Sequence, residues 1–186
     1  MNLNSQRKSF THRIILLIFM ITGFYLVYAF TPPGESDKTE TANYQEYIKT
    51  YAKKAILLKQ KYKIPASIVL AQALLESAGG QGFLALAGNN HFGLKCTDWQ
   101  GLCINKSDDG TNACFRKYLS VNDSFEDYSR FLTERKYYKS LFQLKLTDYK
   151  AWAAGLQQCG YATDPQYATK LIGIIEKFKL YQYDNE

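Results

Sequence analysis

The chain has 186 residues, of which 46% are hydrophobic and 15% aromatic, and its formal net charge is +6. This length predicts one domain with one substantial core after an N-terminal segment. Part of the positive charge lies ahead of the first apolar segment and the rest is dispersed, so the composition does not indicate a nucleic-acid-binding protein.

The N-terminal segment 1–30 has the pattern of an export signal. Basic residues precede a charge-free apolar run over residues 14–30. Val27-Tyr28-Ala29 fits the cleavage site of a signal peptide, whereas the run is also long enough to anchor the chain in a bilayer. We therefore expect a removable signal peptide or a membrane anchor, with the domain exported to the periplasm or cell envelope. Contact with a membrane is expected through this segment alone.

A linker and an amphipathic helix are expected next. Residues 31–42 are polar, contain Pro and Gly and show no periodicity, which predicts a linker. Asn43 and Glu46 resemble a capping box, and apolar residues then recur at helical spacing as far as Tyr62. This helix is expected to pack against the one that follows it.

The second helix carries Glu76 in its last turn. Pro65 is suited to the first turn, nearly every residue from Ile68 to Leu75 is apolar, and Gly79-Gly80 can end the helix. Both the negative end of the helix dipole and an apolar setting raise the pKa of a carboxyl group. A carboxyl that stays protonated near neutral pH is what a general acid requires, although a Glu at a helix end can also simply face solvent.

A small β-hairpin lobe is predicted where the helical period disappears. Two strand-like runs, 92–96 and 113–118, flank a region rich in turn-forming residues. Within it, Asp108-Asp109-Gly110 has the chemistry of a hairpin turn. The functional alternative is that this segment supplies a second carboxylate facing Glu76.

Four cysteines in an exported domain predict two disulfides. Three connectivities are possible, and one of them joins Cys96 to Cys114 and leaves Cys103 with Cys159. A zinc site of His91 with three of these cysteines is the rival interpretation, but the spacing lacks a C-x2-C pair, so we expect no metal. His91 is expected to be a hydrogen-bonded loop histidine.

The rest of the sequence predicts helices up to residue 181, followed by a short tail, 182–186. The expected first residues or caps of these helices are Asn122 or Asp123, Thr147, and Asp164-Pro165. A buried helix that ends in a carboxyl, a hairpin lobe and further helices together suggest a cleft between two lobes, as in lysozyme-like folds.

Four blocks, in this order and spacing, resemble the glucosaminidase family of bacterial peptidoglycan hydrolases, glycoside hydrolase family 73. The blocks are Ala73-Leu74-Leu75-Glu76-Ser77, Asn89-Asn90-His91-Phe92-Gly93-Leu94-Lys95, Phe115-Arg116-Lys117-Tyr118, and Gly160-Tyr161-Ala162-Thr163-Asp164-Pro165 with Tyr167-Ala168. The resemblance covers residues 43–181. It implies an α+β, mainly helical, lysozyme-like domain with a helical lobe, a small β-hairpin lobe and a cleft between them.

The resemblance also implies an activity. A member of this family is expected to act on peptidoglycan glycan strands and to cleave the β-1,4 bond between N-acetylglucosamine and N-acetylmuramic acid without a cofactor. We also expect the chain to be a monomer. Glu76 matches the family's general acid and Tyr161 an active-site tyrosine. Asn90, Phe92 and Gly93 match a loop that borders the cleft and contacts substrate.

The second catalytic group stays open at this point. Asp109, preferred by position, or Asp108 could hold a water and invert the anomeric centre, whereas attack by the substrate's own N-acetyl group would retain it. Three other activities also remain: a lytic transglycosylase, a cysteine amidase or peptidase that uses Cys159 or Cys114 with His91, and a non-catalytic glycan-binding envelope protein.

Overall fold

The computed structural model describes residues 35–108 and 111–186. The predicted signal peptide or membrane anchor, residues 1–30, lies outside the described residues, and so does Asp109. In the part of the chain that is described, no helix is both long and apolar enough to cross a membrane. Residues 43–186 form one compact unit, and the account below concerns that unit.

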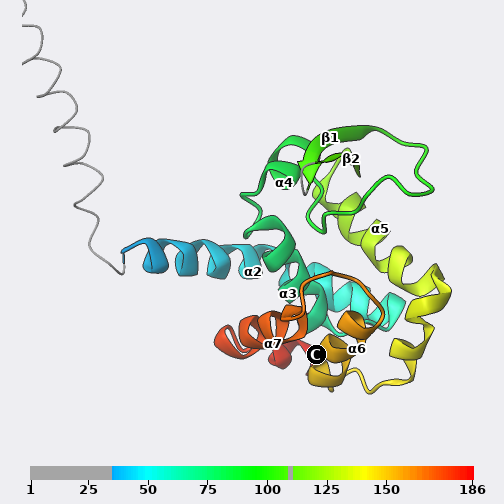
Figure 1. Ribbon diagram of the computed structural model, residues 1–186. Coiled ribbons are helices and arrows are strands. Elements are labelled where there is room, and N and C mark those ends of the chain that lie inside the picture. Colours follow the sequence, from blue (N-terminus) through cyan, green and yellow to red (C-terminus); the bar gives the residue numbers. More distant parts are fainter. Residues whose placement is uncertain (1–34, 109–110) are drawn as a thin grey trace, which may run out of the picture. The chain divides into compact units, whose positions relative to one another are not determined.

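The described chain is mainly helical and carries one two-stranded antiparallel sheet, which confirms the predicted fold class (Figure 1). The helices are α2 (Glu35–Tyr62), α3 (Ala66–Ser77), α4 (Phe83–Gly88), α5 (Val121–Glu134), α6 (Tyr149–Gln158) and α7 (Tyr167–Lys177), with 3-10 helices η1 (Lys136–Gln143) and η2 (Leu180–Asn185). The strands are β1 (Cys103–Asp108) and β2 (Thr111–Arg116). Helices η1 and η2 were not predicted.

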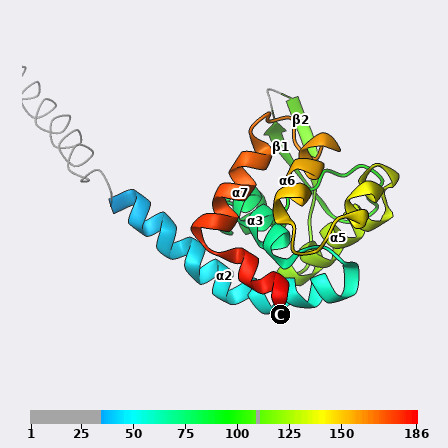
Figure 2. The same ribbon diagram turned by 90° about the horizontal axis from the view of Figure 1, so that it is seen from below.

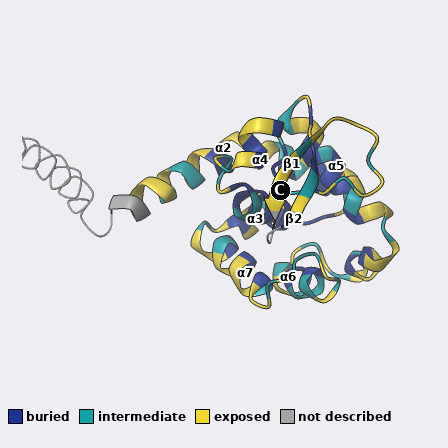
Figure 3. Ribbon diagram, turned by 45° about the horizontal axis from the view of Figure 1, so that its top comes forward, coloured by how far each residue is buried: buried dark blue, intermediate teal, exposed yellow. Residues whose placement is uncertain are grey.

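Helix α3 lies at the centre of the core. Every residue from Ala66 to Leu74 is buried, and the helix contacts α4, α6, α7 and η2. In Figure 3 most of the helices carry both dark blue and yellow residues, as expected for amphipathic helices that cover a shared core. The prediction of a helix buried on all sides is confirmed, and its last turn carries Glu76.

The C-terminal residues belong to the fold rather than to a free tail. Pro65, the N-cap residue of α3, has no side chain that can accept a hydrogen bond from the first N–H groups of the helix. Instead, the buried Asp184 accepts hydrogen bonds from the Ser67 backbone N–H at 2.9 Å and the Ser67 hydroxyl at 2.6 Å. Lys59 of α2 donates to the carbonyl oxygen of Asp184 at 3.0 Å, and Figure 2 shows the C-terminus beside α2. The last turn of the chain thus caps the helix that carries Glu76.

Several predicted helix starts were wrong. Helix α2 begins at Glu35, so part of the predicted linker is helical and Asn43 lies inside the helix. A helix extends cheaply through polar residues once a neighbouring segment has nucleated it, which explains the earlier start. Helix α5 is capped by Ser120, with Asp123 completing the capping box, and α6 is capped by Asp148.

The hairpin is present, but its first strand is not the predicted one. Strand β1 pairs with β2 from Cys103↔Arg116 to Asp108↔Thr111. The predicted run 92–96 contributes a single bridge, Lys95↔Phe115. Gly93 has a φ of +62°, which breaks an extended conformation, so this segment runs as a loop along the edge of β2.

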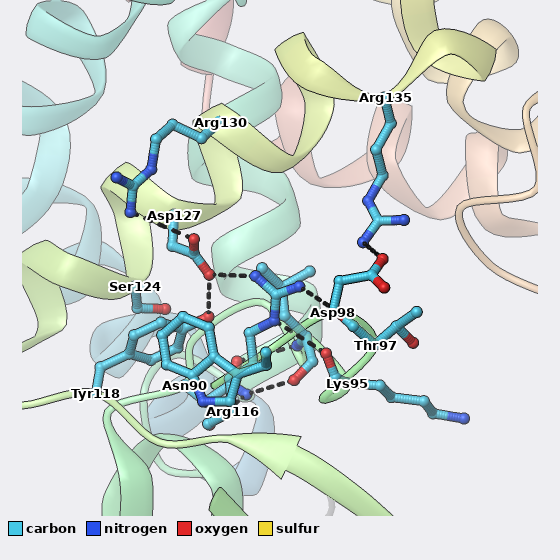
Figure 4. A network of polar contacts seen from close by, with 12 residues as sticks. Asn90, Lys95, Thr97, Asp98, Arg116, Tyr118, Ser124, Asp127, Arg130 and Arg135 are labelled. Carbon is cyan, nitrogen blue, oxygen red and sulfur yellow. Dashed lines mark hydrogen bonds and ion pairs between the residues drawn. The ribbon is translucent and has the colours of Figure 1, made fainter. Parts of the chain in front are cut away.

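A buried ion pair joins the hairpin to α5 (Figure 4). Arg116 Nη1 donates to Asp127 Oδ2 at 2.7 Å, and both side chains are nearly inaccessible to solvent. The same guanidinium donates to the carbonyl oxygens of Lys95 at 3.0 Å and Thr97 at 2.9 Å. Tyr118 adds a hydrogen bond to Asp127 Oδ2 at 2.8 Å. One arginine therefore fixes the loop 95–97 on both the hairpin and the helical lobe.

Only one of the two predicted disulfides is present. Cys96 is bonded to Cys114, whereas Cys103 and Cys159 are free thiols. Cys159 instead donates from its thiol to the carbonyl oxygen of Tyr137 at 3.0 Å. The prediction of two bridges was wrong. The sulfur of Cys103, in the hairpin, lies within 4.8 Å of the two bridged sulfur atoms and is not bonded to Cys159.

Removal of the Cys96–Cys114 bridge should destabilise the protein. The bridge closes a loop with a sequence separation of 18 residues, and on the loop-entropy model Cys96→Ser should lower the free energy of unfolding by about 3 kcal/mol. Urea unfolding of the full chain measures this change. Cys103→Ser is the matched control and should change the free energy of unfolding by less than about 1 kcal/mol; equal losses in the two variants would contradict the prediction.

Candidate active site

Glu76 is held at the end of α3 by a chain of side-chain hydrogen bonds. Tyr167 of α7 donates from its hydroxyl to Glu76 Oε1 at 2.8 Å. Gln72, one turn earlier on α3, donates from Nε2 to the Tyr167 oxygen at 2.8 Å. Tyr128 of α5 donates to Gln72 Oε1. Three helices thus set the position of one carboxyl group.

The direction of this chain determines which oxygen of Glu76 can carry a proton. Because the Gln72 amide donates to the Tyr167 oxygen, the hydroxyl proton of Tyr167 is directed at Glu76 Oε1. Oε1 therefore acts as an acceptor, and a proton on the carboxyl group resides on Oε2. If Glu76 acts as an acid, Oε2 is therefore the oxygen that donates the proton.

The surroundings of Glu76 favour its protonated form. Burial raises the pKa of Glu76, while the hydrogen bond from Tyr167 acts in the opposite direction and lowers it. The net direction is upward, as the sequence predicted, but the larger cause is desolvation. Burial also raises the pKa of the Tyr167 hydroxyl well above its ordinary value, so this group stays neutral and donates.

A cleft of about 620 Å³ opens beside this carboxyl group. Its lining comes from the end of α3, the loop 92–97, the hairpin, the end of α5 and the segment 161–164. Glu76 Oε2 lies 3.8 Å from the position that a Cβ of residue 93 would occupy. A Cβ there would make only an ordinary contact with the acid, so it is the φ of +62° that favours glycine at this position.

The predicted site residues divide into two groups. Glu76, Phe92, Gly93 and Tyr161 line the cleft. Asn90 does not: it is 1% exposed, and its amide bonds the backbone of Leu94 and the carbonyl oxygen of Arg116, which shapes the loop from behind. The loop around Phe92 therefore owes its conformation to Asn90.

Tyr161 contacts the cleft wall rather than Glu76. Its hydroxyl donates to the carbonyl oxygen of Phe92 at 3.3 Å, and its ring stacks on Tyr167 with centroids 5.7 Å apart. Burial raises the pKa of Tyr161 well above its ordinary value, so its hydroxyl is neutral. Two carboxylates were candidates for the second catalytic group. Asp109 lies outside the described residues, and Asp108 is the last residue of β1.

Tyr167, Gln72 and Tyr128 were not identified from the sequence as site residues. Gln72 offered a signal, because a polar residue within a helix apolar on all faces must find a partner when it is buried. Tyr167 stood in the last family block without an assigned role. The partner of Gln72 on α5 could not be found from the sequence, since the two residues are 56 positions apart.

Replacing Tyr167 by Phe should shift the pH dependence of the reaction. The hydrogen bond that lowers the pKa of Glu76 would be lost, so that pKa should rise further. An acid works in its protonated form, so the limb on which activity falls with rising pH should move to higher pH. The rate below that limb should fall by about tenfold, because Oε1 is no longer held. A pH–rate profile measures both effects, and an unshifted limb would contradict the assignment.

His91 has a structural role in the described chain. It is 4% exposed, its Nδ1 lies 2.6 Å from the Tyr47 hydroxyl, and burial lowers its pKa to about 4. Cys114, one proposed nucleophile, is in the disulfide, and Cys159 bonds a backbone carbonyl oxygen. These contacts do not support a cysteine amidase that uses His91.

Among the described residues, one group has ligand atoms close enough to share a metal ion. The sulfur atoms of Cys96, Cys103 and Cys114 lie within 4.8 Å of one another. Two of them form the disulfide and offer no thiolate while it is intact. His91, the fourth ligand of the zinc alternative, is bonded to Tyr47.

Comparison with known proteins identifies the family. The family model described as mannosyl-glycoprotein endo-beta-N-acetylglucosaminidase matches residues 52–180. The exo-glucosaminidase LytG of Bacillus subtilis is 34% identical, and the match covers 96% of this chain and 68% of LytG. The chain spans half or less of two other curated relatives that it matches.

Solved structures agree with this result. The catalytic domain of the autolysin Auto from Listeria monocytogenes superposes with a TM-score of 0.64 at 31% identity, covering 83% of this chain and 98% of that domain. The glycoside hydrolase domain of FlgJ from Salmonella typhimurium gives a TM-score of 0.61 at 32% identity, covering 75% of this chain and 90% of that domain. The chain therefore belongs to the glucosaminidase family and is a glycoside hydrolase.

Proposed function

We propose that this protein hydrolyses peptidoglycan at the β-1,4 bond between N-acetylglucosamine and N-acetylmuramic acid, with Glu76 as general acid. The observation that carries the proposal is the state of Glu76. Its carboxyl group borders the cleft, burial raises its pKa, and Tyr167 occupies Oε1 so that Oε2 carries the proton. A glycosidic oxygen in the cleft would accept that proton as its bond to the sugar ring breaks.

Positive charge builds on the sugar ring as this bond breaks. The neutral hydroxyl of Tyr161 lies on the same cleft wall, with its own proton directed to the Phe92 carbonyl oxygen. Its oxygen lone pairs are therefore left to face positive charge, which would stabilise the oxocarbenium-like state or orient the sugar. Phe92 and Gly93 would form the floor of the same subsite.

As the glycosidic bond breaks, the anomeric carbon is attacked either by a water held by Asp109 or Asp108, or by the N-acetyl oxygen of the substrate, whose cyclic intermediate a water then opens. The first route inverts the anomeric centre and the second retains the β configuration. The anomer released first, read by NMR before mutarotation, distinguishes the routes. A retained anomer would exclude both aspartates as the base of an inverting reaction.

We further propose that the protein acts in the cell envelope. LytG, FlgJ and Auto are named as a glucosaminidase, a peptidoglycan hydrolase and an autolysin, and the apolar run 14–30 has the pattern of an export signal. A polymer outside the cytoplasmic membrane requires an enzyme delivered there. Fractionation of cells that express the full chain tests this location.

End-group analysis tests the proposed bond. Purified peptidoglycan is digested with the full chain in mild detergent, or with its Glu76→Gln variant, and the new ends are reduced with borohydride and identified by mass spectrometry. We expect reduced N-acetylglucosamine ends with the wild type and almost none with the variant. Reduced muramic ends, anhydro-muramic ends or an undiminished variant would each refute the proposal, and anhydro ends would indicate a lytic transglycosylase.

A further inference from the structure

We infer that Lys106 and Arg135 form a carboxylate-binding subsite on the wall of the cleft. This inference rests on the proposed function and names the feature of the polymer that the cleft selects. Both residues line the same cleft as Glu76, Lys106 from β1 and Arg135 from the end of α5. The two lobes thus each contribute one positive charge.

Arg135 is held in place but still has free capacity to donate. Its guanidinium lies 4.3 Å from the centroid of the Phe131 ring, and Nη1 donates to the Tyr137 hydroxyl at 3.2 Å. Its ion pair with Asp98 is long, 3.7 Å, and Asp98 is 82% exposed, so water competes strongly for that contact. Figure 4 shows Arg135 reaching from α5 toward the loop that carries Thr97 and Asp98. A guanidinium has five N–H groups, so a carboxylate of the substrate could still bind.

Lys106 completes the subsite from the hairpin. It lies opposite Ala113 in the sheet, is exposed, and lines the cleft. Among the side chains that the structure describes, no ion pair involves Lys106, so none of their carboxylates holds its ammonium group. An exposed ammonium on a flexible stem can follow a mobile anionic group.

The carboxylates among the described residues of the cleft lining do not neutralise these two cations. Glu76 has a raised pKa and is uncharged when it acts as an acid. Asp164 is paired with Lys170 at 2.5 Å. Among the described residues that line the cleft, no carboxylate is therefore paired with Lys106 or Arg135.

A neutral sugar polymer has no carboxylate that Lys106 and Arg135 could bind. A peptidoglycan strand carries carboxylates on its stem peptides, and where the peptide has been removed it carries one on the lactyl group of each muramic acid. A polymer of N-acetylglucosamine alone carries none. The two cations would therefore favour a muramic-acid polymer over a neutral polymer of the same backbone.

The test compares charge variants on three substrates. The variant Lys106→Gln/Arg135→Gln is matched with Lys53→Gln/Lys139→Gln, which removes two exposed charges outside the cleft. The substrates are peptidoglycan, the same glycan after amidase removal of its stem peptides, and that stripped glycan with its lactyl carboxylates converted to methyl esters. Half-saturating concentration and kcat are measured for the full chain at low and high salt.

We expect the cleft variant to raise the half-saturating concentration about three- to tenfold on a carboxylate-bearing substrate, the effect of losing two ion pairs that water can reach. Its kcat should stay unchanged, and so should its half-saturating concentration on the methyl ester. An effect on peptidoglycan alone would assign the stem peptide as the source, and an effect that persists on the stripped glycan would assign the lactyl group. An equal change on the ester, or in the matched control, would overturn the inference.

Binding separates this inference from the proposed function. Co-sedimentation of the Glu76→Gln protein with intact peptidoglycan, with and without the two cleft substitutions, requires no turnover. If the wild type releases no N-acetylglucosamine ends, the proposed function fails while the binding comparison still reports on the subsite. If the ends appear but the cleft substitutions weaken neither binding nor half-saturation, the inference alone fails.

Discussion

Replacing Glu76 by Gln should lower kcat by about three orders of magnitude, the usual contribution of a general acid. The amide can still accept the hydrogen bond from Tyr167 at its oxygen, so the side chain should keep its place. It has no proton acidic enough to protonate a leaving oxygen. Release of reducing ends from peptidoglycan at pH 6 measures the effect.

The same substitution should stabilise the fold at neutral pH. Burial raises the pKa of Glu76 in the folded state above its value in the unfolded chain. The contribution of such a group to stability is complete below the unfolded pKa and is lost as the pH rises through the folded pKa. A neutral amide avoids that loss, so the variant's advantage in melting temperature should grow from pH 4 to pH 7. Lost activity together with a lowered melting temperature would show unfolding, not loss of the acid.

Replacing Arg116 by Met should cost about 3 to 5 kcal/mol of the free energy of unfolding, because it leaves the Asp127 carboxylate buried without its main partner. The carbonyl oxygens of Lys95 and Thr97 lose their donor in the same step. The loop at the cleft wall should therefore loosen as well. Urea unfolding of the full chain measures the free energy.

Arg130→Met is the matched control for this prediction. Arg130 also contacts Asp127, at 3.4 Å, but its side chain is 54% exposed, so its loss should cost less than about 1 kcal/mol. Replacing both members of the buried pair, Arg116→Met with Asp127→Leu, should recover a large part of the loss, since no uncompensated charge remains. Similar losses for Arg116→Met and Arg130→Met would contradict the prediction.

The sequence by itself determined the elements whose cause is local. The apolar run of α3 and the pair Gly79-Gly80 predicted a buried helix with Glu76 in its last turn, and that helix is present. The four spaced blocks predicted the family and the mainly helical fold. The helix follows from the order of residues along a few turns of chain, and the blocks indicate the family by resemblance, so both can be read without tertiary structure.

Contacts between distant segments were decided only by the tertiary structure. Asp184 caps α3 across 117 positions, and Tyr167 reaches Glu76 across 91. The sequence singled out Tyr161 beside Glu76, and the structure adds Tyr167, which donates to Glu76 Oε1 while Tyr161 donates to the Phe92 carbonyl oxygen. Nothing local to α7 indicates which of two nearby tyrosines will face the acid.

Contacts between distant segments also decided where β1 lies, which cysteines are bonded and how Glu76 is buried. Residues 103–108 have turn chemistry, and pairing with β2 makes them a strand. Cys103 lies beside a disulfide rather than in one, because pairing is fixed by the distances that the fold sets. For Glu76 the sequence determined the helix end and the carboxyl group. The tertiary structure decided its burial, the oxygen that Tyr167 occupies and the oxygen left to the cleft, since each of these depends on packing among α3, α5 and α7.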